Sequence, residues 1–210
     1  MEIDEFFSQN YVSGSIKDRE QFVEVYERLK EKIEFEAIER DPEKYNQVMR
    51  LTADYAHILV EKDSFNKAIP YLERAIHLME GYTGFDQNKL WKVEFYTVLR
   101  FDRMVANYKL KNFDKAQADS VWLIKYFPEN DQFQNWFNTI RRQKLNKTHY
   151  LFLALTIIGI FLSMVKDGEN EILHWAIIIL LSIGLIGSLS IEILKRRNIP
   201  INAKKNTPNQ

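Results

Sequence analysis

The pattern of apolar and polar positions divides the chain near residue 148. Before that point, apolar residues return every three or four positions, the spacing of one face of an α-helix. After it, two long apolar runs, residues 150–165 and 172–194, flank a short polar stretch. As a helix, the uncharged part of each run would be about 25 Å long, close to the roughly 30 Å of a hydrocarbon core. Residues 148–197 are therefore predicted to form a two-helix transmembrane hairpin.

The residues before the hairpin predict an all-α cytoplasmic domain over 16–147. The first helix is expected over about 16–40, because Phe22, Tyr26, Leu29 and Ile33 recur at helical spacing. Asp41 followed by Pro42 is a start signal for a second helix, which is expected to end near residue 62.

The sequence also predicts the structure of the segment before this domain, of the last helix of the domain and of the C-terminal tail. Residues 1–15 form an aromatic leader, whose Gly14 and serines indicate a loop and whose aromatic rings are expected to dock on the domain. The helix around Phe133 is expected to continue into the membrane, since neither glycine nor proline interrupts residues 130–157. The basic tail, residues 198–210, is expected to be disordered.

Residues 49–82 resemble a tetratricopeptide repeat, a unit of two antiparallel helices with small residues where they cross. With Phe65 at the aromatic position that opens the second helix, alanines occupy the three small positions: Ala56, Ala68 and Ala75. The apolar positions are then Leu59, Val60, Leu72 and Leu78. Thr52, at a position where an aromatic is common, and Pro70, early in the second helix, depart from the pattern.

A weaker copy of the repeat starts its second helix at Phe113, and Pro128 falls where the family places its closing proline. Met104 and Ser120 depart from the pattern here. The two copies are 48 residues apart rather than 34. We expect the surplus in residues 81–85 and in a long helix over about 86–111. The resemblance covers about residues 44–129 and implies an array of helical hairpins of the tetratricopeptide type.

Charge is distributed unevenly along the chain. The whole chain has a formal net charge of zero, whereas residues 1–148 are slightly acidic and the segment after Leu194 has five bases and no acid. The acidic balance of the soluble part gives no support to nucleic-acid binding. The basic tail suits an anionic lipid surface. The chain has no cysteine, which excludes disulfides, thiol catalysis and cysteine-based zinc sites.

The bases that flank the hairpin predict its orientation. They are Arg141, Arg142, Lys144 and Lys147 on one side and Lys195, Arg196, Arg197, Lys204 and Lys205 on the other. The loop between the runs has one base, Lys166, and three acids. By the positive-inside rule both termini are cytoplasmic, and we expect two spans, in a bacterial inner membrane. Glu192 is expected to pair with Lys195 or Arg196 at the interface.

No catalytic motif is recognisable. The chain has no glycine-rich phosphate loop, nucleophile elbow or HExxH spacing, so we expect neither an enzyme nor a cofactor or metal. His57 and His77 lie on adjacent repeat helices and could approach each other. A binding site on the first helices of the repeats would present His57, Val60, Phe101, Val105 and Tyr108, an apolar groove for a hydrophobic or helical segment. Alternatively, Phe101 and Tyr108 pack against neighbouring helices.

Small residues mark where the hairpin helices could associate closely: Gly159 and Ser163 in the first run, Gly184 and Ser188 in the second. They would either close the hairpin or build a homo-oligomer. The sequence therefore leaves two functional hypotheses. The first is a membrane-anchored adaptor that recruits a protein partner to the cytoplasmic face of the membrane. The alternative is an oligomeric membrane effector, or a pore-forming accessory protein of a bacterial defence system.

Overall fold

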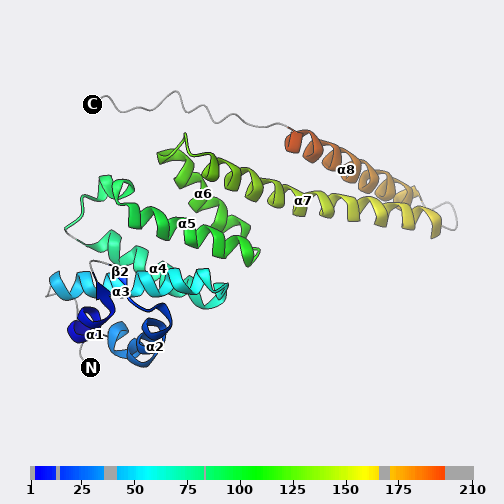
Figure 1. Cartoon of the computed structure of the whole chain (residues 1–210). Helices are drawn as coiled ribbons and strands as arrows, with labels where there is room; N and C mark the ends of the chain where they lie inside the picture. Colours follow the sequence, from blue (N-terminus) through cyan, green and yellow to red (C-terminus); the bar gives the residue numbers. More distant parts are fainter. Residues whose placement is uncertain (1–2, 13–14, 36–41, 83, 166–170, 197–210) are drawn as a thin grey trace. The chain divides into compact units, whose positions relative to one another are not determined.

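A computed structural model describes residues 3–12, 15–35, 42–82, 84–165 and 171–196 of the chain (Figure 1). These residues form an all-α structure, apart from one minimal pair of two-residue strands. The chain divides into two compact units, residues 1–126 and 127–210. The division falls before the helix that carries the first apolar run, rather than at the start of that run.

The first unit contains most of the helices. Its elements are α1 (Ile3–Asn10), β1 (Tyr11–Val12), β2 (Ser15–Ile16), α2 (Arg19–Phe35), α3 (Pro42–Glu61), α4 (Phe65–Gly81), the 3₁₀ helix η2 (Gln87–Lys92), α5 (Glu94–Lys109) and α6 (Phe113–Tyr126). The strands β1 and β2 pair antiparallel, Tyr11 with Ile16. Successive helices pack on one another from α2 to α6, and α3 also contacts α1 and α5. In a stack of helical hairpins, each helix is expected to pack on the next one along the chain in this way.

The two hairpin loops, α3–α4 and α5–α6, have the same backbone structure at an offset of 48 residues. The N–H of Ser64 donates to the carbonyl of Leu59, and the N–H of Asn112 donates to that of Asn107, both at 2.8 Å. Each loop has one residue with positive φ, Asp63 at 56° and Lys111 at 61°. This is the Schellman pattern, which satisfies the last carbonyls of a helix. The second helices therefore start where the sequence predicted, at Phe65 and Phe113.

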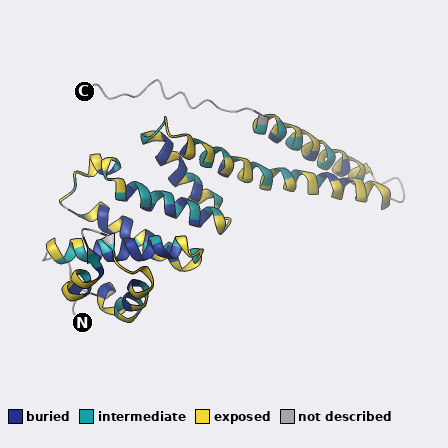
Figure 2. Ribbon diagram, viewed as in Figure 1, coloured by how far each residue is buried: buried dark blue, intermediate teal, exposed yellow. Residues whose placement is uncertain are grey.

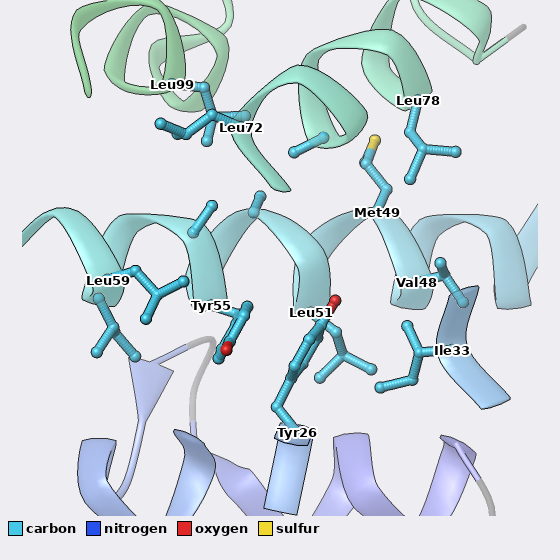
Figure 3. Packing of buried hydrophobic residues seen from close by; sticks show 14 of the residues in the cluster. Tyr26, Ile33, Val48, Met49, Leu51, Tyr55, Leu59, Leu72, Leu78 and Leu99 are labelled. Carbon is cyan, nitrogen blue, oxygen red and sulfur yellow. The ribbon is translucent and has the colours of Figure 1, made fainter. Parts of the chain in front are cut away.

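The core of the first unit is centred on α3. Tyr26 of α2 stacks on Tyr55 of α3 with the ring centroids 4.0 Å apart (Figure 3). On the other side of α3, Met49 points toward Leu78 of α4, and Leu72 of α4 lies beside Leu99 of α5. The three alanines at the small positions of the first repeat, Ala56, Ala68 and Ala75, are fully buried. Their missing volume lets α3 and α4 approach closely.

Two elements differ from the sequence-based expectation. The leader is not only a loop, because residues 3–10 form α1 and bury Phe6 completely against Phe22. The helix expected over 86–111 is broken into η2 and α5, with Val93 in an extended conformation between them. Asp86 caps the N-terminus of η2, where its side chain accepts a hydrogen bond from the N–H of Asn88.

Several expectations fall outside the described residues. They concern Gly14, residues 36–40 of the first predicted helix, Asp41, the loop base Lys166, Arg197 and the tail 198–210. Arg196 ends a described helix, but its side chain is outside the description.

The second unit consists of α7 (Asp131–Val165) and α8 (Glu171–Arg196), which pack along each other. As predicted, α7 runs without interruption from the amphipathic segment around Phe133 into the apolar run. Both helices are long and apolar enough to cross a membrane. Large apolar side chains are exposed along both helices from Tyr150 to Leu194 (Figure 2). Among the described residues of the first unit, Val121 alone is a large exposed hydrophobic.

Candidate functional site

The five residues of the predicted partner face lie on two helices that contact each other. His57 and Val60 belong to α3, and Phe101, Val105 and Tyr108 belong to α5. All five are partly buried. Tyr108 also contacts the ring of Phe113, with centroids 5.9 Å apart. The face is therefore partly engaged within the domain and partly open to a partner.

A partly buried pair, His57 of α3 and Asp102 of α5, joins the two helices of this face. Nδ1 of His57 lies 2.6 Å from a carboxylate oxygen of Asp102, and its Nε2 lies 3.6 Å from Glu61. The hydrogen bond with Asp102 raises the pKa of His57, although burial opposes this. Burial raises the pKa of Asp102, and the contact with His57 opposes that rise. Of the two histidines that the sequence places on adjacent helices, His57 is half-buried against Asp102 and His77 is exposed on α4.

A second buried carboxylate joins α5 to α6. Asp119, whose side chain is 2% exposed, accepts hydrogen bonds from Arg100 at 2.9 Å and from two nitrogens of Arg103 at 2.7 and 2.8 Å. Arg100 also bonds Glu80 of α4 at 3.0 Å. Such bidentate, charge-assisted bonds fix the relative position of the helices. Burial and the hydrogen bond to Glu80 raise the pKa of the Tyr96 hydroxyl to about 12.

Beside this network lies an open cavity of about 320 Å³. Four aromatic residues, one leucine, two amides and one carboxylate line it: Trp91, Tyr96, Trp122, Tyr126, Leu90, Gln87, Asn88 and Glu80. We refer to it as the aromatic pocket. Its volume falls at the lower end of the range for small-ligand sites. Sequence reasoning missed it because the pocket combines residues 80–96 with Trp122 and Tyr126 of α6, which come together only when α6 packs on the preceding helices.

The hairpin of the second unit closes through glycines of α8. A Cβ on Gly184 would lie 2.9 Å from the backbone nitrogen of Thr156 and 3.0 Å from the carbonyl of Phe152. A Cβ on Gly187 would meet the ring of Phe152. Gly159 of α7 faces Leu180 and Leu181 in the same way. Gly184 and Gly159 thus pack within one hairpin.

The two serines of the predicted pairs behave differently. The hydroxyl of Ser188 lies 3.3 Å from Nδ1 of His149, a polar contact between α8 and α7. Ser163 is exposed, and its hydroxyl bonds the carbonyl of Ile160 in its own helix. Gly187 and its partner Phe152 were not singled out from the sequence. The signal was present, since Gly187 follows Gly184 at the i+3 spacing of one helix face.

The bases near the ends of the hairpin are mostly solvent-facing. Arg142, Lys144 and Lys147 are exposed, and Arg141 reaches the carbonyl of Leu194 at 3.4 Å. Lys195 pairs with Glu192 at 3.7 Å, as expected for an interfacial ion pair.

Within the described ranges, no group of three or more histidine, aspartate or glutamate side chains is arranged to hold a metal ion. Comparison with protein-family models, curated proteins and solved structures found no match for this chain. What is established is therefore an all-α chain with two long apolar helices at its C-terminal end.

Proposed function

We propose that this protein is a membrane-anchored adaptor, with a tetratricopeptide-like helical domain that recruits a protein partner to the cytoplasmic face of a bacterial inner membrane. The observation that carries the proposal is the distribution of exposed apolar side chains. They cover the outer surfaces of α7 and α8 and are nearly absent from the described part of residues 1–126. In water such a surface would be costly, at roughly 25 cal/mol for each Å² of apolar area. In a bilayer it is the ordinary lipid-facing surface of a helix pair.

The tetratricopeptide-like character is supported by three features of the first unit. The hairpins α3–α4 and α5–α6 share one loop structure at the same 48-residue offset that the sequence indicated. The small residues of the first copy are buried at a helix crossing. The helices contact one another in the order of a stacked array. Arrays of this kind present extended surfaces to protein ligands.

The adaptor would bind its partner through the face formed by α3 and α5. Phe101, Val105 and Tyr108 recur on one side of α5 and are partly exposed, which suits an apolar or helical segment. The near-neutral, slightly acidic domain does not attract nucleic acid.

The proposal is tested by exchanging the anchor. We expect a chimera in which residues 148–197 are replaced by an unrelated two-helix anchor to recover the same partner in affinity purification from detergent, identified by mass spectrometry. Phe101→Ala should lose that partner. Val121→Ala, which removes an exposed apolar side chain from α6, is the matched control and should keep it.

The alternative, an oligomeric effector or pore, is tested by comparing the parent protein with Gly184→Leu. Gly184→Leu keeps α8 apolar but places a side chain against the backbone of α7. For an adaptor, native mass spectrometry and ion flux across proteoliposomes should show no channel in the parent protein. Ion flux that disappears in Gly184→Leu would reject the adaptor and favour the pore.

A further inference from the structure

The aromatic pocket is built by the residues that lengthen the repeat. Gln87, Asn88, Leu90 and Trp91 all belong to η2, in the connection that makes the two copies 48 rather than 34 residues apart. The rest of the wall comes from the end of α4, the start of α5 and α6. A repeat of ordinary length would have no residues here. The pocket is therefore an addition to the hairpin array, on different helix surfaces from the face of Phe101 and Val105.

The aromatic rings of the pocket form a connected cluster. Trp91 and Tyr126 are nearly parallel, with centroids 5.7 Å apart and planes inclined by 16°. Trp122 contacts Tyr126 at 4.9 Å and Tyr96 at 5.4 Å. Because Tyr96 is buried and tied to Glu80, the cluster is anchored on its inner side. Trp91, Trp122 and Tyr126 are partly exposed and supply the open side.

The charges around the pocket disfavour a free small cation and a free anion as its main ligand. A free cation is disfavoured because the chain already places its own cations on these rings. The Arg100 guanidinium is 5.2 Å from the centroids of both Tyr96 and Trp122, and Lys92 is 5.3 Å from that of Trp91. A phosphate or other anion is disfavoured because the charged residue of the lining, Glu80, is an acid.

What remains is a neutral ligand with flat apolar surfaces and exposed carbonyls. We propose that the aromatic pocket binds a proline-rich protein segment in the polyproline II conformation. Proline rings pack on Trp and Tyr faces, and this helix forms with little loss of entropy and leaves its carbonyls unpaired. The side-chain amide of Asn88, an exposed residue of the lining, is a donor for those carbonyls.

Glu80 adds a preference for the residue that flanks the prolines. Its side chain is 42% exposed. Tyr96 and Arg100 donate hydrogen bonds to this side chain. Among the described residues, both bonds are accepted by Oε1. A basic residue at the end of the proline-rich segment can approach the exposed side of this carboxylate. The inference goes beyond the adaptor proposal by adding a second binding site, and it rests on that proposal for a protein segment as the kind of ligand.

The test is a direct titration of the full-length protein in nanodiscs. The probe is a ten-proline peptide with one terminal arginine, and the signal is tryptophan fluorescence, because two of the four tryptophans line the pocket. We expect saturable binding, weakened about 10-fold or more by Trp91→Ala and much less by Trp91→Phe, as for loss of an aromatic anchor. His77→Gln, at an exposed position of α4 outside the pocket, is the control and should bind like the parent.

Three further measurements make the outcome decisive. Glu80→Gln should abolish the preference for the arginine peptide over one ending in glutamate while keeping the binding of prolines. Asn88→Ala, on the exposed turn, should weaken binding severalfold and serves as the pocket variant if Trp91→Ala does not fold by circular dichroism. Tetramethylammonium and AMP, titrated in parallel, should not bind.

The proposal is overturned if the proline peptide does not bind at millimolar concentration, if binding is unchanged in the folded pocket variants, or if tetramethylammonium or AMP binds instead. Its failure is distinguishable from that of the adaptor. The pocket is tested with a purified peptide, whereas the adaptor is tested by partner recovery with the exchanged anchor and with Phe101→Ala.

Discussion

At the scale of single residues, the two hairpin loops place a residue with a side chain where glycine is favoured. Asp63 and Lys111 both have φ near +60°, at the position that follows the end of a helix. In this region the Cβ of an ordinary residue crowds the backbone, at a cost of roughly 1 kcal/mol. The hydrogen bonds of each loop hold the residue there nonetheless.

Replacing Lys111 with glycine should stabilise the protein. We expect Lys111→Gly to raise the free energy of unfolding by about 0.5–1 kcal/mol, because relief of backbone strain exceeds the added entropy of the unfolded chain. Thermal unfolding in detergent, followed by circular dichroism, would show the higher midpoint. Ala118→Gly, at an exposed position in the interior of α6, should instead lower stability by about 1 kcal/mol. Equal effects of the two changes would contradict the Schellman assignment.

The pair of His57 and Asp102 should make stability depend on pH. The hydrogen bond raises the folded-state pKa of His57 above its usual value near 6.5. Its contribution is therefore fully present below pH 6.5 and is lost as the pH rises through the folded-state pKa. The raised pKa of Asp102 acts in the same direction, beginning above about pH 4.

An NMR titration of the His57 ring should give a pKa above 6.5, and Asp102→Asn should lower it. Unfolding midpoints measured from pH 5 to 9 should fall less steeply in Asp102→Asn than in the parent. His77→Gln changes an exposed histidine of α4 and should leave the profile unaltered. A His57 pKa that does not respond to Asp102→Asn would mean that the ion pair is absent in solution.

At the scale of elements, the spacing of apolar residues was sufficient to predict a helix wherever that helix has a strong apolar face and clear end signals. The bounds of α3, α4 and α6 follow from Pro42, Phe65 and Phe113. It failed for α1, whose eight residues are too short to establish a period. It also failed at Val93, where the sequence has neither glycine nor proline. That break accompanies the packing of η2 against α5 and α6 around Trp91, a tertiary effect that a local pattern does not contain.

The crossing of α3 and α4 should not tolerate a larger side chain at Ala75. This alanine is fully buried, so Ala75→Leu should force neighbouring side chains out of their preferred rotamers and cost about 1–3 kcal/mol. Thermal unfolding of the full-length protein is the measurement. His77→Leu adds a leucine two positions away on the exposed side of α4 and should be nearly neutral. A normal melting midpoint for Ala75→Leu would show that the register of the first repeat is wrong.

At the scale of the whole molecule, the sequence was informative about the arrangement of segments and silent about sites. The apolar runs predicted both long helices, and small residues at i, i+4 spacing indicated where the hairpin closes at Gly184. The aromatic pocket and the His57–Asp102 pair could not be predicted, because each joins residues that come together only when several helices stack. Local patterns carry no information about such long-range neighbours.

The orientation of the hairpin gives the last prediction. Nine bases flank it on the side of the two termini, against one in the loop, so both termini should be cytoplasmic. A reporter active only in the cytoplasm, fused after Gln210, should be active, and one active only outside should not. Replacing Glu169, Asn170 and Glu171 with lysine gives the loop four bases against nine and removes two of its acids, which reduces the charge asymmetry and should give mixed orientations, whereas glutamines at the same positions should not. An external C-terminus in the parent protein would place the helical domain outside and remove the basis for a cytoplasmic adaptor.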